Sequence, residues 1–190
     1  MIEMRGKELV AKILKGERDF SGVRFDLNLE IYEHLDEMRV YLEKQNLEKS
    51  PVNVSNSLFE NLKAKGLYLP FLVAKNANFY RADLRNADLS SADFTYAYLR
   101  DARLRGANLS NSYLRDARLA GANFRDTNLG YADIRGADLE NALNLGFAIF
   151  NSTRVTEKEE DIIMKALKSR KLFAVERPWP HQMRQLGTLL

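Results

Sequence analysis

Residues 77–141 repeat every five positions, and this period restricts the fold more than any other feature of the sequence. One position of each repeat, called i here, is always Leu, Phe or Ile: Phe79, Leu84, Leu89, Phe94, Leu99, Leu104, Leu109, Leu114, Leu119, Phe124, Leu129, Ile134 and Leu139. The position two residues earlier, i−2, is Ala in every repeat except at Ser112 and Thr127. Neither a helix nor a long strand keeps both sets on one buried side. A chain with this period must therefore turn back toward its core every five residues.

The same register continues on both sides of this segment. When the register is extended backward in steps of five residues, positions i and i−2 are occupied by apolar or small residues as far as about residue 51. In the other direction the phase slips once at residues 142–145 and resumes one residue late, with Phe150 and Val155 at i. We therefore expect one continuous repeat region over residues 51–155.

Several of the repeats share a motif. ANFYR, ADLRN, ADLSS and ADFTY follow one another from residue 77, and ANLSN and ADIRG come later. These repeats resemble the A(D/N)LXX motif of the pentapeptide-repeat family. The resemblance implies an all-β fold, a right-handed quadrilateral β-helix with four repeats, hence twenty residues, in each coil. Residues 51–155 would then form about five coils, roughly 24 Å of solenoid at the spacing of neighbouring strands.

A stack of coils exposes unpaired backbone at both ends, so it needs covers. We expect residues 1–50 to form an α-helical N-terminal cap. The pattern predicts a helix over residues 1–15, a short strand within residues 16–25 and an inserted helix over residues 30–48. The inserted helix lies either beside the coils or within the cap.

Residues 156–190 are expected to close the other end. Thr156 and Glu159 have the spacing of a capping box, which predicts a helix over residues 157–171. The tail beyond it lacks clear periodicity, and its apolar residues either pack on their own chain or join two chains into a homodimer. The residues expected at such a dimer contact are Trp179, Leu186 and Leu189.

The sequence excludes several kinds of site. The chain has no Cys and two His, which leaves no thiolate or His-rich metal site and no Cys nucleophile. Asp83, Asp88 and Asp93 occupy i−1 of successive repeats, so under the family geometry they point outward from different faces and cannot form a catalytic pair. A core filled by Leu and Phe leaves no pocket. We expect a non-enzymatic protein with no cofactor or metal, cytoplasmic because leader and apolar span are lacking, and with no membrane partner.

Arginine side chains form stripes on the expected surface, because residues twenty apart stack on one face. Arg85, Arg105 and Arg125 form one column at i+1, and Arg115 and Arg135 form a shorter one. A ladder of guanidinium groups is suited to binding an anion, a phosphate or a nucleic acid. The alternative interpretation is a solvated ladder of salt bridges with the neighbouring acids, which contribute little free energy. These acids are Asp101, Asp116 and Asp126.

Exposed Tyr beside Arg is typical of protein interfaces, and Tyr98 and Tyr113 fall on outward positions. The resemblance also implies a second role, imitation of DNA by an acidic rod that binds DNA gyrase and confers quinolone resistance. Residues 77–151 carry nine Arg, eight Asp and one Glu, a net charge of zero, which weighs against that role. The sequence thus favours a protein-interaction scaffold with an unidentified protein partner. The alternatives are a gyrase-binding DNA mimic and a nucleic-acid or anion binder that uses the Arg columns.

Overall fold

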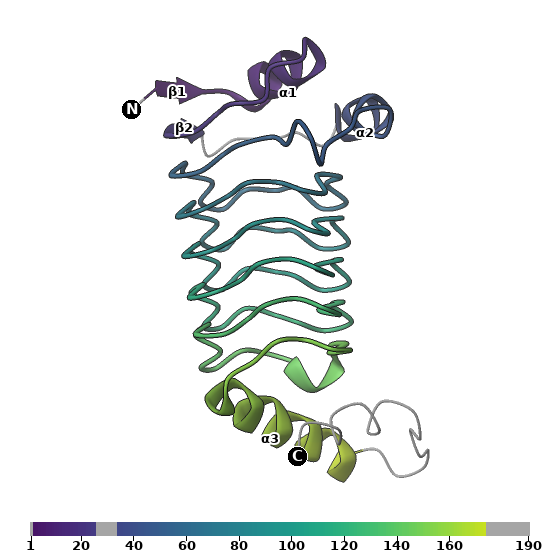
Figure 1. Cartoon of the computed structure of the whole chain (residues 1–190). Coiled ribbons are helices and arrows are strands. Elements are labelled where there is room, and N and C mark those ends of the chain that lie inside the picture. Colours follow the sequence, from purple (N-terminus) through teal and green to yellow (C-terminus); the bar gives the residue numbers. More distant parts are fainter. Residues whose placement is uncertain (1, 26–33, 174–190) are drawn as a thin grey trace.

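The structure, a computed structural model, describes residues 2–25 and 34–173. Figure 1 shows coils stacked into a rod, with the N-terminal elements over one end and a C-terminal helix over the other. Residues twenty apart in sequence form parallel bridges between neighbouring coils. Each of the four repeats in a coil has its own series of bridges, and one series contains Asn53, Val73, Asp93, Tyr113 and Asp133.

The coils pair through single bridges rather than through strands. The chain turns in every repeat because the residue two positions after i takes a left-handed backbone conformation, with φ of 56° at Asn86, 58° at Asp101 and 61° at Tyr131. Gly, Asn and Asp tolerate this conformation best, which explains their frequency at that position. Such frequent turns leave no room for longer strands, so the β-structure of the coils is a ladder of isolated bridges.

The rod is filled by the residues that the period assigns to the core. Side chains at i, such as Leu84 and Leu104, are fully buried, and so are the Ala residues at i−2. Near the N-terminal end the rings of Phe25, Phe59 and Phe79 stack, with centroids 4.3 and 4.8 Å apart. Burying one Leu or Phe side chain contributes roughly 1.5–3 kcal/mol relative to exposure. This apolar column is therefore the main stabilising feature of the coils.

The Asp or Asn at i−1 has a structural role. Its Oδ1 accepts a hydrogen bond from the backbone N–H two residues later, from Ser90 to Asp88 at 3.1 Å and from Thr95 to Asp93 at 3.0 Å. Side chains that bond their own backbone in this way stabilise turns. The residues that make this bond are Asn53, Asn78, Asp83, Asp88, Asp93, Asn108, Asn123, Asn128, Asp133 and Asp138.

The N-terminal end begins with a strand, where the sequence predicted a helix. β1 (Ile2–Met4) pairs in parallel with β2 (Val23–Phe25), and α1 (Gly6–Leu14) lies between them in sequence. The prediction was wrong at this point because the backbone of the first residues pairs with β2 instead of bonding within a helix. Arg24 of β2 forms a parallel bridge with Leu58, which joins this layer to the first coil.

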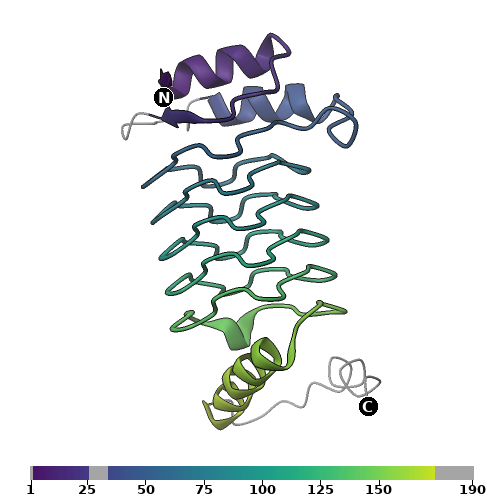
Figure 2. The ribbon, with the colours of Figure 1, turned by 60° about the vertical axis from the view of Figure 1, so that its left-hand side comes forward.

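A second helix, α2 (Leu35–Leu42), lies beside α1 over the open end of the coils (Figure 2). It is shorter than the helix predicted over residues 30–48, part of which lies outside the described residues. An apolar cavity of about 30 Å³ lies beneath the two helices, with Ile13, Met38 and Phe59 among its walls. This cavity corrects the expectation of a core without a pocket, although it is far smaller than the roughly 300 Å³ of a ligand site.

The predicted phase slip occurs near the C-terminal end. There the bridged residues are 21 apart in sequence, as for Asn128 and Ile149. In the preceding coils the bridged residues are 20 apart. The extra residue is accommodated beside η2 (Leu145–Phe147), a short 3-10 helix that follows a left-handed residue, Asn144. The slip therefore lets the chain leave the regular coil without breaking the series of bridges.

α3 (Glu157–Phe173) covers this end of the coils (Figure 1). It begins at the predicted capping box, in which the backbone N–H of Thr156 donates to Oε2 of Glu159 at 2.7 Å. The helix comes so close to η2 that a Cβ on Gly146 would lie 2.6 Å from the carbonyl oxygen of Ala166. Glycine is required there because any side chain would push α3 away.

The described residues bear on two further expectations, the homodimer and the absence of a membrane-spanning helix. The proposed dimer residues Trp179, Leu186 and Leu189 lie outside the described residues, so the homodimer stays a prediction. Within the part that is described, none of the helices has the length and apolar character needed to cross a bilayer.

A basic face as the candidate binding site

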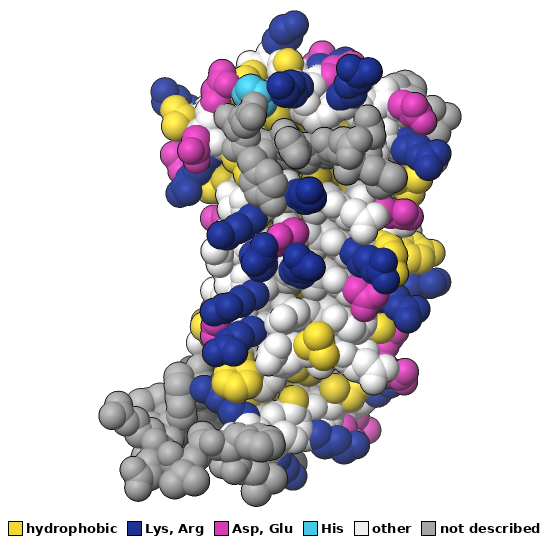
Figure 3. All heavy atoms as spheres, turned by 180° about the vertical axis from the view of Figure 1, so that it is seen from behind, with side chains coloured by type: hydrophobic (Ala, Val, Ile, Leu, Met, Phe, Trp, Pro, Cys, Tyr) yellow, Lys and Arg dark blue, Asp and Glu magenta, His cyan; other side chains and the backbone are white. Residues whose placement is uncertain are grey.

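One side of the coils is basic. Side chains at i−1 and i+1 point outward, because the side chain between them points into the core. Stacking at twenty-residue intervals aligns these outward positions in four successive coils. We call this surface the basic face, and its outward residues are Lys63, Lys65, Asp83, Arg85, Arg103, Arg105, Asn123 and Arg125. Figure 3 shows Lys and Arg side chains gathered in a band along the coils.

The column of Arg85, Arg105 and Arg125 expected from the sequence is present. The backbone carbonyl of each of these residues accepts a hydrogen bond from the preceding coil, at 2.8, 3.0 and 2.9 Å. Their backbones are thus about 4.8 Å apart, the spacing of hydrogen-bonded strands. Lys65 occupies the same position one coil before Arg85, which lengthens the column toward the N-terminal end.

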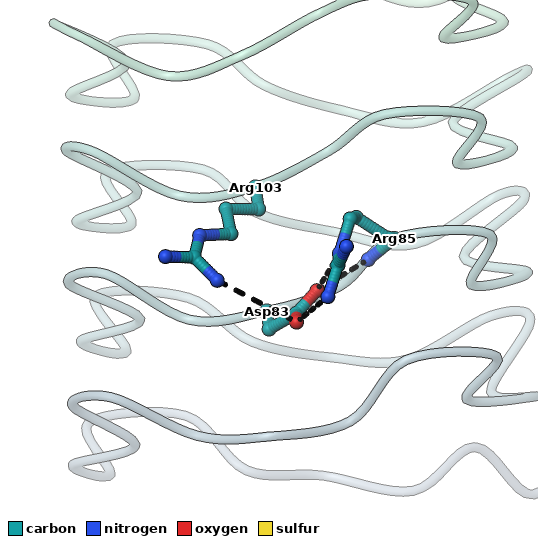
Figure 4. A network of polar contacts seen from close by, with 3 residues as sticks. All are labelled: Asp83, Arg85 and Arg103. Carbon is teal, nitrogen blue, oxygen red and sulfur yellow. Dashed lines mark hydrogen bonds and ion pairs between the residues drawn. The ribbon is translucent and has the colours of Figure 1, made fainter.

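Asp83 is the one acid among the outward residues of the basic face, and it is held by Arg85 (Figure 4). Nε and Nη2 of Arg85 donate to its two carboxylate oxygens at 2.7 and 2.5 Å, and Nη1 of Arg103 lies 4.0 Å away. Burial raises the pKa of Asp83, but the hydrogen bonds and charge of Arg85, helped by Arg103, outweigh it and hold the pKa below its usual range. The carboxylate is therefore ionised at neutral pH and fixes the Arg85 guanidinium.

The other arginines of the face are held less firmly. The side chains of Arg103 and Arg105 are 66% and 58% exposed. Arg105 and Arg125 share the carboxylate of Asp126, with each Nε 3.7 Å from its Oδ2, and that acid is itself 57% exposed. Solvated pairs of this kind contribute little free energy. Two acids thus stand against six cations, which leaves the basic face positively charged.

A groove of about 430 Å³ lies where the chain turns onto the basic face. Its walls include the cations Lys63, Arg81 and Arg103 and the acids Asp83 and Asp101. Because Asp83 is already bonded by Arg85, its charge is largely compensated. Three cations from successive coils thus stand against one uncompensated acid, Asp101, and the remaining positive charge favours an oxyanion.

Arg115 and Arg135 lie on another side of the coils, that of the bridge series with Asp93, Tyr113 and Asp133. Nε and Nη2 of Arg135 donate to the carboxylate of Asp133 at 2.8 and 2.6 Å. These hydrogen bonds, partly opposed by burial, hold the pKa of Asp133 below its usual range and raise the pKa of Arg135. The structure therefore separates the shorter predicted column from the basic face.

Tyr98 and Tyr113 also lie away from the basic face. Tyr98 is 40% exposed, and the guanidinium of Arg118 stacks 4.5 Å from the centre of its ring. Tyr113 is 50% exposed, and Tyr96, at the turn just before Tyr98, is 54% exposed. We call Tyr96, Tyr98 and Tyr113 the tyrosine patch, because they belong to two successive coils and to the two adjoining sides that meet at the turn of Tyr96.

Three cations of the site, Lys63, Lys65 and Arg81, were not predicted from the sequence. The two lysines lie twenty residues before Asp83 and Arg85, so following the charges back in the established register would have found them. Arg81 occupies a left-handed position, with φ of 55°, which the motif usually gives to Asn, Asp or Gly. A basic residue in this unfavourable backbone conformation could have indicated that Arg81 has a role beyond the turn.

The salt-bridge interpretation of the Arg columns holds for one acid and fails for two. Within the described chain Asp126 pairs with arginines, but Asp101 and Asp116 do not. Their Oδ1 atoms instead lie 2.2 Å from where a Cβ would stand on Gly121 and Gly136, so each carboxylate fills the space left by a glycine of the next coil. The described residues also contain no group of three His, Asp or Glu that could hold a metal ion.

The repeats match a known family, and several solved structures are similar. The sequence model of the pentapeptide repeats matches residues 75–111 and 102–141. No curated protein matches the chain. A pentapeptide repeat protein from the thylakoid lumen of Arabidopsis thaliana is 23% identical, over 57% of this chain and 74% of its own, with a TM-score of 0.28. A pentapeptide repeat protein from Nostoc PCC 7120 is 22% identical and aligns over 82% of this chain and 98% of its own length, with a TM-score of 0.29.

QnrB1, a plasmid-mediated fluoroquinolone resistance protein, is 14% identical, over 79% of this chain and 78% of its own, with a TM-score of 0.30. TM-scores this low give the structural likenesses no weight for the function of this chain. The family match coincides with the five-residue register and with bridges twenty residues apart. Residues 75–141 therefore carry the repeats of the pentapeptide-repeat family, as the sequence motif predicted.

Proposed function

We propose that this protein is a non-enzymatic scaffold that holds its basic face against an anionic partner. Pentapeptide-repeat proteins generally serve as scaffolds without enzymatic activity. The observation that carries the proposal is the charge of the basic face, where six cations lie on one side of a regular stack of coils. Elsewhere the outward Asp side chains accept hydrogen bonds from their own backbone, which gives them a structural purpose.

The complete architecture is part of the same proposal. Pentapeptide-repeat proteins form right-handed β-helices. A right-handed quadrilateral β-helix of about five coils over residues 51–155 accounts for four series of bridges at steps of twenty residues. Residues 1–50 and 156–190 would serve as its caps. A location in the cytoplasm remains a prediction.

The cations of the basic face outnumber the two acids that pair with them, and this excess of positive charge supports a role in binding. Arg85, Arg105 and Arg125 stack one above another, and like charges directly opposite on neighbouring strands are destabilising. Asn or Ser at these positions would avoid that repulsion and leave the core unchanged. An anionic partner that bound between the arginines would remove the repulsion.

Retention on immobilised heparin, a generic polyanion, tests this proposal. We expect the double variant Arg105→Glu with Arg125→Glu to elute at much lower salt than the wild type. The matched control is Arg100→Glu with Arg115→Glu, which changes the net charge equally at exposed i+1 positions of other faces. The control should lose far less retention. Equal loss in both variants, or no retention of the wild type, would show that the basic face is not a binding site.

A protein partner that docks on the tyrosine patch is the second candidate function. Tyr96, Tyr98 and Tyr113 are each at least 40% exposed, and Tyr stacked with Arg is enriched at the centre of interfaces. Tyr98→Asn is a suitable variant because Asn is native to the same column at Asn78, where it bonds its own backbone. We expect this variant to fold and to lose a co-purifying partner. A partner that stays bound to Tyr98→Asn would exclude the patch.

The gyrase-binding DNA mimic has weaker support. A mimic of DNA needs an acidic rod, whereas residues 77–151 sum to zero charge and the basic face is positive. Carboxylates such as Asp83 and Asp133 are moreover bonded by adjacent arginines. A gyrase supercoiling assay is the direct test, and we expect no inhibition by the wild-type protein.

A further inference from the structure

We infer that the anionic partner of the basic face is a nucleic acid whose phosphate backbone lies along the axis of the coils. This inference rests on the proposed binding role of the face. It names the chemistry of the partner, which a retention experiment on a generic polyanion leaves open. Three features of the face support it: the absence of apolar side chains, the line formed by its cations, and the recess beside that line.

The basic face lacks the apolar centre that a protein partner requires. Between Lys63 and Arg125 its outward residues are all charged or polar. Protein interfaces are depleted of charge at their centre and enriched there in aromatic residues and Met. On this side of the coils, the first exposed apolar side chain after Arg125 is Leu143, which is 52% exposed and lies in the last coil. A partner of the basic face is therefore recognised by its charge.

The cations form a line that suits a regularly charged polymer. Lys65, Arg85, Arg105 and Arg125 occupy one column over three coil steps, about 14 Å at the strand spacing. Lys63 and Arg103 flank this column. Each strand of duplex DNA carries one charge for roughly 3.4 Å of the helix axis, closer than the roughly 4.8 Å between successive cations, so a strand that follows the column offers a phosphate to each cation. Arginine, the commoner cation here, matches phosphate oxygens with two parallel hydrogen bonds.

The groove beside the column provides a deeper phosphate position. Lys63, Arg81 and Arg103 approach it from successive coils. Among the residues that the structure describes, the face carries no helix or protruding ribbon that could enter a groove of the nucleic acid. Contacts to phosphates alone position a nucleic acid without reading its bases. We therefore expect binding that depends steeply on salt and only weakly on sequence.

Fluorescence anisotropy with a short labelled DNA duplex and a labelled single-stranded RNA tests the inference. The matched variants are Arg105→Ala, on the basic face, and Arg115→Ala, an exposed i+1 arginine on another side. Arg105→Ala should weaken binding roughly three- to tenfold and reduce the steepness of the salt dependence by about 0.9 in log–log slope for the duplex. Arg115→Ala should leave both quantities near the wild-type values. Binding of either the duplex or the RNA in this manner supports the inference, and the stronger of the two names the form of nucleic acid.

Labelled polyglutamate and phosphatidylserine vesicles separate the inference from the proposal on which it rests. If either binds in an Arg105-dependent way while both nucleic acids do not, the nucleic-acid inference is overturned and the basic face remains a binding site. If Arg105→Ala and Arg115→Ala are alike with all four probes, the inference and the proposed function both fail.

Discussion

Two sides of the same coils use their outward positions in opposite ways. On one side, Asn108 donates from Nδ2 to Oδ1 of Asp88 at 3.2 Å, and Asn128 donates to Oδ1 of Asn108 at 3.3 Å. We call this side, with Asp88, Asn108 and Asn128, the amide face. On the basic face the equivalent position of one coil is Arg103, whose side chain is 66% exposed. In this fold an outward side chain can therefore join neighbouring coils or remain exposed to bind a partner, and the core is the same in both cases.

The largest expected effect is a loss of unfolding free energy when a side chain of the amide face is removed. Asn108→Ala removes the hydrogen bonds to Asn108 from Ser110 N–H at 3.2 Å and Ser110 Oγ at 2.8 Å, together with both bonds between coils. At roughly 0.5–1 kcal/mol for each of the four bonds, the free energy of unfolding should fall by about 2–4 kcal/mol. Arg103→Ala at the equivalent position should change it by less than about 0.5 kcal/mol.

Urea unfolding followed by circular dichroism measures both variants. Equal losses of unfolding free energy for Asn108→Ala and Arg103→Ala would remove the distinction between the two faces. The slope of the transition should stay near that of the wild type, because neither variant alters the surface exposed on unfolding.

Much of this fold follows from the sequence alone. The five-residue period assigned the core, and the structure buries both Leu84 and Ala82 as predicted. The late resumption at Phe150 is also observed, because Ile149 just before it bridges Asn128 across 21 residues. A core position is set by its own side chain and register, so one sequence suffices to find it.

The binding site was harder to predict. The register placed Arg105 and Arg125 in one column and Arg115 and Arg135 in another, and the structure keeps the two columns on different sides. The pairing of Arg85 with Asp83 depends on side-chain conformation, which the repeat does not fix. Outward residues contribute little to the core, so their pattern constrains neither their partners nor their function.

A smaller effect is expected from removing the acid of the basic face. Asp83→Asn removes one negative charge, and Asn supports the same bond to the backbone in other repeats, as at Asn108. We expect polyanion binding to become roughly threefold tighter, because the net charge of the face rises by one unit. Binding no tighter than that of the wild type would show that Asp83 does not limit the charge of the face.

The same variant changes the response of stability to acid. The pKa of Asp83 in the folded protein lies below its value in the unfolded chain, near 3.9. Its contribution to stability is therefore complete above about pH 4 and is lost as the pH falls through the folded-state pKa. Thermal unfolding between about pH 5 and pH 2 should show a steeper loss for the wild type than for Asp83→Asn. Parallel curves would mean that the Asp83–Arg85 pair is not stabilising.

The smallest effect should come from giving an exposed position the side chain used on the amide face. Tyr113 occupies i−1, where Asn or Asp bonds its own backbone in other repeats. Tyr113→Asn should raise the free energy of unfolding by a few tenths to about 1 kcal/mol, the usual worth of one net hydrogen bond. A decrease measured by the same urea transition would show that Tyr113 stabilises the coils and is not kept for binding.

Chemical-shift mapping of backbone amides by NMR tests the central claim most directly. On addition of a short DNA duplex to the wild-type protein, the amides of residues 63–65, 83–85, 103–105 and 123–125 should shift together and saturate at one affinity. The amides of residues 88, 108 and 128 on the amide face should remain in place. Shifts centred on the amide face, or spread evenly over all sides of the coils, would contradict the assignment of the basic face as the binding site.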